Sequence, residues 1–157
     1  MSRAQNLKSR QQFESALALE KSGDTQAALK LYEKSVVTDP SNSHAWNRQM
    51  ILYRRLRSKA EEFKLIKTAI KEYQSSAQSK QQEWLNENKE KAESTRELAN
   101  ALGLLESTGL PKKEDAMLEK WQTRLYLLEY RIKNARRKKT SGKKKAAGNS
   151  EHSGTKN

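Results

Sequence analysis

The feature that most constrains the fold is the segment 23–40, which reads GDTQAALKLYEKSVVTDP. Gly23 can adopt the positive φ that stops a preceding helix, and Asp24 can accept a backbone N–H from the first turn of the next helix. The residue before Pro40 is biased away from helical backbone, so the second helix should end near Thr38. The segment therefore predicts two helices joined by a tight turn, over residues 11–22 and about 25–38.

The same apolar pattern returns about 34 residues later, which is the spacing of one class of helical repeat. Phe63 stands one period after Leu29, and Ile70 one period after Val36. The other matched pairs are Gln12–Trp46, Ala16–Met50, Ala18–Leu52, Leu19–Tyr53, Leu31–Leu65, Tyr32–Ile66 and Ser35–Ala69. Two helical stripes rarely stay in phase by chance, so we predict two repeat units, at residues 9–42 and 43–74.

This stretch resembles the tetratricopeptide repeat (TPR) family. The family's first helix carries a Trp, a Leu-Gly pair and a Tyr, and its second an Ala, an aromatic residue, another Ala and then a Pro. The residues on those positions are Trp46, Tyr53, Ala28, Tyr32, Ala69 and Pro40. The departures are Gln12 for the Trp, Ser15-Ala16 and Gln49-Met50 for Leu-Gly, Glu62 for the small Ala and Gln74 for the Pro. The chain also looks like small bacterial TPR-like proteins, a resemblance that implies no defined activity.

Beyond Tyr73 the period fails. A polar, helix-favouring run predicts a single long helix over about 77–105 that overhangs the repeats. After a break at 109–111, a heptad stripe is formed by Leu118, Trp121, Leu125, Leu128 and Ile132. The stripe is too short for a free coiled coil, so we expect this helix to fold back on the long helix and close the repeats. Self-association through the stripe is the alternative.

Most of the net charge of +13 lies at the C-terminus, where residues 131–157 hold ten Lys or Arg against one Glu. The segment 136–157 has no apolar periodicity, so we expect a disordered basic tail, as we expect a flexible N-terminus at 1–8. The tail could bind nucleic acid, ribosomes or an acidic membrane surface by charge, or could only solubilise the chain. Its candidate contacts are Arg136, Arg137, Lys138, Lys139, Lys143, Lys144 and Lys145.

The residues that carry chemistry in enzymes are sparse. The chain has no cysteine, two histidines (His44 and His152), and no metal-ligand, phosphate-loop or nucleophile motif. We therefore expect no enzymatic activity, no metal and no cofactor. Neither a secretory signal nor a membrane-spanning run is visible, which favours a cytoplasmic protein, and we expect a monomer.

The TPR resemblance implies a concave groove lined by the first helix of each unit. The residues expected there are Phe13, Leu17, Glu20, Asn47, Arg48, Ile51, Arg54 and Arg55. Apolar anchors beside arginines could hold an acidic segment of a partner, unless Leu17 and Ile51 pack on neighbouring helices instead. The family's carboxylate clamp is not expected, because Phe13 and Leu17 stand where its Lys and Asn would be.

These patterns predict an all-α fold of two TPR-like units, a long helix, a capping helix and a disordered basic tail. The function they favour is a non-enzymatic protein–protein interaction scaffold with an unidentified protein or peptide partner. The alternative is a nucleic-acid- or ribosome-associated protein tethered by its tail. We expect Trp46, Tyr53, Trp84 and Trp121 to lie in the core rather than to stack on bases.

Overall fold

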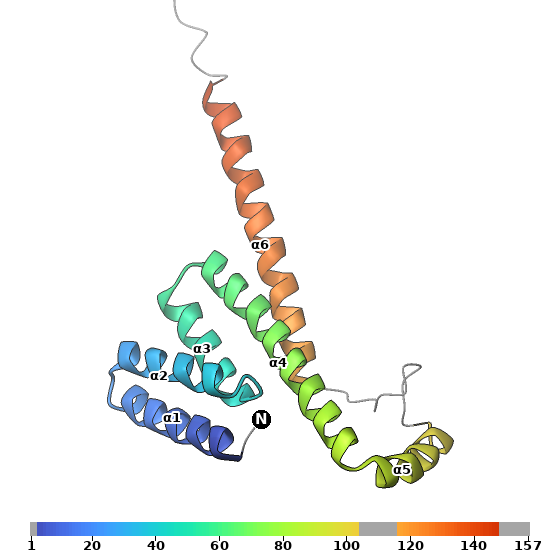
Figure 1. Cartoon of the computed structure of the whole chain (residues 1–157). Helices are drawn as coiled ribbons and strands as arrows, with labels where there is room; N and C mark the ends of the chain where they lie inside the picture. The colour runs from blue at the N-terminus through green and yellow to red at the C-terminus, as the bar shows by residue number, and fades with distance from the viewer. Residues whose placement is uncertain (1–2, 104–115, 148–157) are drawn as a thin grey trace, which may run out of the picture.

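The computed structural model describes residues 3–103 and 116–147, without the side chains of 90, 92 and 138–147. Every regular element in these ranges is an α-helix (Figure 1), which confirms the all-α class. The helices are α1 (Arg3–Lys21), α2 (Thr25–Thr38), α3 (Ser43–Leu56), α4 (Lys59–Glu87), α5 (Lys89–Ala101) and α6 (Ala116–Ala147). Helices α1 and α2 form one helix–turn–helix pair, and α3 forms a second with the first part of α4.

The turns follow from local chemistry. Gly23 has a φ of 93°, and the Asp24 side chain accepts a hydrogen bond from the Ala27 backbone N–H at 3.1 Å, as predicted. The cap of α3 is Asn42, whose side chain accepts a hydrogen bond from the Ala45 backbone N–H at 3.2 Å. Asn42 also donates to Ser9 and Ser35, so the cap is fixed by contacts with α1 and α2 that lie far away in the sequence.

The core runs between the two helix pairs and out to α6. Trp46 and Trp121 are buried and Tyr53 is half-buried, but Trp84, expected in the core, is 50% exposed. The buried apolar residues are Ala16, Ala28, Leu29, Tyr32, Val36, Ala45, Trp46, Met50, Leu52, Ile66, Ala69, Trp121 and Leu128. The matched positions of the repeat thus supply most of the core.

Helix α4 is longer than predicted, since it continues past Tyr73 to Glu87. The sequence between Tyr73 and Trp84 holds no Gly or Pro, and extending a helix costs far less than starting a new one. The chain breaks instead at Asn88, with φ −124° and ψ 38°. The long helix predicted over 77–105 is therefore divided between α4 and α5, and the large apolar residues Leu98 and Leu102 of its second part are exposed.

Helix α6 packs along α4 rather than capping a separate long helix, and its heptad stripe faces the core, with Trp121 and Leu128 buried. The helix then runs on past Arg136 and leaves the bundle (Figure 1). Helix α6 extends to Ala147, so it includes the first part of the predicted basic tail, and the disorder of that tail stays a prediction. The expected disorder of 148–157 lies outside the described residues.

The N-terminal prediction also changes, since α1 begins at Arg3 and includes most of the segment expected to be flexible. The Asn6 side chain connects this N-terminal segment to the α2–α3 loop, since it donates a hydrogen bond to Asp39 at 3.3 Å. In the part of the chain that the structure describes, none of the helices has the length and apolar content needed to cross a membrane.

Candidate functional site

The N-terminal half of the predicted groove is an open hollow. Phe13 and Leu17 of α1 line it together with the loop between α2 and α3 and the start of α3. The hollow measures about 570 Å³, and its other lining residues are Asn6, Arg10, Glu14, Asp39, Ser41, Asn42, Ser43 and His44. This is where the structure leaves room for another molecule beside α1.

The hollow has an apolar side and a polar side. The Phe13 ring lies 5.7 Å from the Tyr32 ring and 6.1 Å from the His44 ring, measured between centroids. These contacts hold Phe13 half-buried, with Leu17 one helical turn away on the same face of α1. Arg10 and Glu14 lie on the same face of α1 as Phe13 and Leu17 and are exposed beside them. The arrangement suits an apolar side chain inserted among groups that can form hydrogen bonds.

Glu20, which the sequence predicts to face a ligand, is engaged within the protein. It forms an ion pair with Arg48 of α3, whose Nε donates to Oε2 at 3.1 Å, and it accepts a hydrogen bond from Tyr32 at 2.8 Å. Burial opposes ionisation, but the bonds from Arg48 and Tyr32 outweigh it and lower the pKa of Glu20. Burial, reinforced by Glu20, raises the pKa of Tyr32 to about 12. The Glu20–Arg48 ion pair joins the two repeat units.

The α3 half of the predicted groove is in contact with α6. Trp121 Nε1 donates to Asn47 Oδ1 at 2.7 Å, and Asn47 Nδ2 donates to the sulfur of Met117 at 3.2 Å. Asn47 therefore anchors a helix of the same chain. The helix that contacts this half is α6, not the long polar helix that follows the repeats.

Glu62 is the most enclosed ionic group of this region. Its side chain is 2% exposed and lies between Arg54 of α3 and Arg124 of α6. Arg124 donates two bonds of 2.9 Å, one to each carboxylate oxygen, and Arg54 donates one of 3.2 Å. Burial opposes ionisation, but the bonds from Arg124 and Arg54 hold the pKa of Glu62 below its ordinary value. The carboxylate stays ionised and ties α6 to the repeats.

The eight predicted groove residues do not form one open surface. Phe13 and Leu17 line the hollow, whereas Glu20, Asn47, Arg48 and Arg54 contact other parts of the chain. Of the remaining two, Ile51 is half-buried and Arg55 is exposed. Because Arg48 and Arg54 are paired with glutamates, an acidic segment gains less here than the sequence suggests.

The sequence marks Glu62 only as a departure from the small Ala of the repeat pattern. A signal for its role was present, since a charged residue on the buried face of a helix needs a partner of opposite charge. Arg124 lies on the heptad helix, three residues after Trp121, but sequence spacing alone does not show that these elements meet. The link between residues 62 and 124 exists only in the folded chain.

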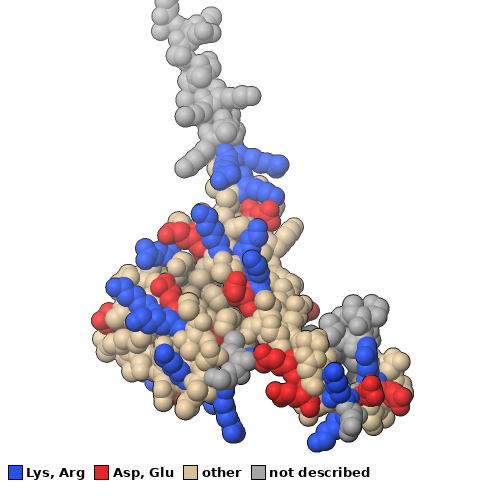
Figure 2. All heavy atoms as spheres, in the orientation of Figure 1, with Lys and Arg blue, Asp and Glu red and all other residues tan. Residues whose placement is uncertain are grey.

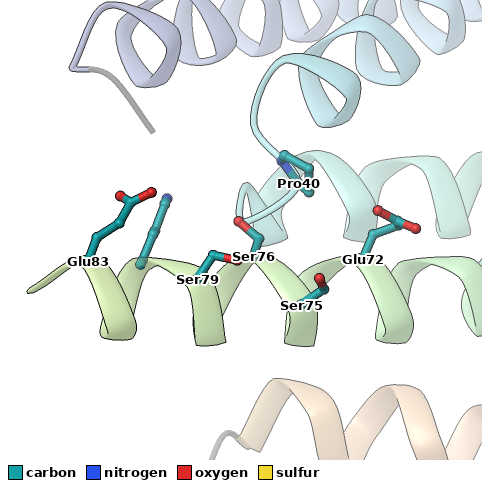
Figure 3. Close-up of a pocket in the computed structure, with 7 residues that line it drawn as sticks. Pro40, Glu72, Ser75, Ser76, Ser79 and Glu83 are labelled. Atoms are coloured by element: carbon teal, nitrogen blue, oxygen red, sulfur yellow. The ribbon is translucent and has the colours of Figure 1, made fainter. Parts of the chain in front are cut away.

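A second, smaller hollow of about 240 Å³ lies along α4 (Figure 3). Ser76 points toward the loop that carries Pro40, and its buried hydroxyl finds no hydrogen-bond partner among the described residues. Lys80, also on α4, bonds to Asp39 and Ser41 of that loop. The other lining residues are Glu72, Ser75, Ser79 and Glu83. The bonds from Lys80 therefore hold the α2–α3 loop against α4 beside this hollow.

Three acidic residues of this region, Glu20, Asp39 and Glu62, form ion pairs within the protein. The pKa values of Glu20, Asp39 and Glu62 are lowered, whereas a carboxyl that serves as a general acid near neutral pH needs a raised pKa. Among the described residues, no group of three or more His, Cys, Asp or Glu side chains is placed to hold a metal ion.

The predicted tail contacts divide in two. Arg136 and Arg137 are exposed on α6. The backbone of the other five is helical, and their side chains lie outside the described residues; they are Lys138, Lys139, Lys143, Lys144 and Lys145.

Comparison with protein-family models, with curated proteins and with solved structures found no match to this chain. The relation to tetratricopeptide proteins therefore remains a resemblance of sequence pattern.

Proposed function

We propose that this protein is a non-enzymatic interaction scaffold that binds a segment of a partner protein in the hollow beside α1. The observation that supports the proposal is the open hollow lined by Phe13 and Leu17, whose lining includes no residue of α6. The Glu20–Arg48 ion pair and the bond from Lys80 to Asp39 join the two helical pairs and give that hollow a fixed frame. We infer that an apolar side chain of the partner enters it and that the rim forms hydrogen bonds to the partner backbone.

The proposed partner differs from the one expected from sequence. Arg10 and Glu14 place one charge of each sign on the rim, so the hollow favours no strongly acidic segment. Apolar contact should then dominate the affinity, and the interaction should depend little on salt.

The test is affinity capture from a native lysate with the wild type and Leu17→Glu, read by mass spectrometry. The matched control is Leu7→Glu, since Leu7 is exposed on the same helix but does not line the hollow. A partner of this site should be lost with Leu17→Glu and kept with Leu7→Glu.

Glu14→Lys is a second test variant in the capture experiment. Its side chain is exposed on the rim, so a loss of capture cannot be attributed to disturbed packing. The proposal fails if every captured protein is retained equally by all variants, with thermal unfolding confirming that each is folded.

A further inference from the structure

The outward side of α6 carries a second feature that the scaffold does not explain. Tyr126 and Tyr130 are 68% and 60% exposed, although Trp121 and Leu128 of the same helix are buried. The two tyrosines are four residues apart, so their rings lie one above the other on one face of the helix. Leu127 beside them is 41% exposed. Two aromatic rings thus face solvent, and no helix among the described residues covers them.

The same helix becomes strongly basic where it leaves the bundle. Residues 131–147 hold nine Lys or Arg and no Asp or Glu, and the helix extends through all of them. Figure 2 shows Lys and Arg at the end of the described side chains of α6 with acidic side chains close by, and Lys133 is paired with Glu129 at 2.8 Å. At about 1.5 Å per residue, these positive charges lie along about 25 Å of helix. Such a charge density is complementary to a polyphosphate backbone.

We propose that this arm of α6 binds single-stranded nucleic acid, with Tyr126 and Tyr130 stacking on bases and the basic side chains of residues 131–137 contacting phosphates. Exposed rings next to a basic stretch are the combination that single-strand binding uses, because every base offers a flat face. A duplex hides those faces and would be held by charge alone, which leaves the two exposed rings without a role.

The arm does not suit a membrane surface. An interfacial helix needs an apolar face along its length, but Tyr126, Leu127, Tyr130 and Ile132 lie only at the start of the arm, and the apolar residues that follow are Ala135, Ala146 and Ala147. The proposal is independent of the hollow beside α1, so either function can fail without the other.

The test is fluorescence anisotropy of the full chain with a labelled single-stranded RNA of mixed sequence. Tyr126→Ala and Tyr130→Ala should each weaken binding about fivefold or more, whereas Tyr126→Phe and Tyr130→Phe keep the rings and should bind as the wild type does. Both residues are exposed, so the changes should leave the thermal unfolding temperature unaltered.

A charge series tests the role of the basic residues. The double change Arg136→Gln with Arg137→Gln should reduce the slope of log Kd against log salt by about 0.7 for each phosphate that the protein no longer neutralises. The matched control is Lys30→Gln with Lys34→Gln, which removes the same charge from exposed positions on α2 and should leave the slope unchanged.

Three results would overturn the proposal. The first is equal affinity for the same RNA annealed to its complement, and the second is equal affinity of the alanine and phenylalanine variants. The third is tighter binding to vesicles with anionic lipid than to the single strand. Leu17→Glu should leave RNA binding intact, which separates this site from the proposed protein-binding hollow.

Discussion

Removing the buried carboxylate of Glu62 should destabilise the protein more than removing any exposed charge. Loss of one member of a buried ion pair costs about 3–5 kcal/mol, because the remaining charge is left without a partner. The low end applies here, since Arg124 and Arg54 are 22% and 51% exposed and can turn toward water. We therefore expect Glu62→Ala to lower the free energy of unfolding by about 3 kcal/mol.

Arg124 and Arg54 should contribute unequally to the stability that their ion pairs with Glu62 provide. Arg124 donates two bonds of 2.9 Å to Glu62, whereas the half-exposed Arg54 donates one of 3.2 Å. Double-mutant cycles should give a coupling energy of about 2 kcal/mol for Glu62 with Arg124 and at most about 0.5 kcal/mol for Glu62 with Arg54.

Urea unfolding followed by far-UV circular dichroism measures these energies, with Arg54→Ala as the matched control. Tryptophan fluorescence gives a second readout, because Trp121 becomes solvated if α6 leaves α4. A loss below about 1 kcal/mol for Glu62→Ala, or equal coupling to both arginines, would refute the assignment of Glu62 as the anchor of α6.

Three further predictions concern stability. The free energy of unfolding should fall as pH drops from about 6 to about 3, because the folded-state pKa values of Glu20, Asp39 and Glu62 lie below their ordinary values and the unfolded chain takes up protons first. Urea titrations at each pH measure this free energy. The prediction is contradicted if the double variant Glu20→Gln with Glu62→Gln shows the same slope of unfolding free energy against pH as the wild type. Trp121→Ala should lower the free energy of unfolding by about 3 kcal/mol, and Trp121→Phe by distinctly less, since the phenyl ring keeps most of the packing and loses only the bond to the Asn47 side chain. Equal losses of free energy for the two variants in urea unfolding would count against the packing role. Ser58→Ala should lower the free energy of unfolding by about 1 kcal/mol by removing the capping box with Glu61 at the start of α4; a calorimetric scan that matches the wild type would exclude that role.

The parts of the fold that sequence could predict are those set by neighbouring residues. Gly23 and Asp24 specify the first turn through their own backbone and side-chain preferences, and the spacing of Trp121 and Leu128 specifies which side of α6 is buried. The period relating Leu29 to Phe63 predicts the helical pairs for the same reason, since each helix buries one stripe.

The rest depends on contacts between distant segments. The chain has no helix-breaking Gly or Pro near Tyr73, and only the folded structure shows that the helix continues as far as Asn88. The groove prediction assigned Asn47 and Arg54 to a ligand, but Asn47 bonds to Trp121 because of the position of α6, and Arg54 bonds to Glu62 because α3 packs on α4. The exposure of Tyr126 and Tyr130 does have a local signal, since the two residues lie off the heptad stripe at a spacing of one helical turn.

The break at Asn88 has a consequence for how the molecule opens. No side chain caps the start of α5, and none of its described side chains is buried, whereas α4 is fixed by a capping box and by buried Ile66 and Ala69. A helix of this length without tertiary burial is marginal in water. Amide hydrogens of α5 should therefore exchange at rates set by local fraying, while those of the first half of α4 should exchange only with global unfolding. The long helix and its continuation thus belong to different cooperative units, with Asn88 as the boundary between them.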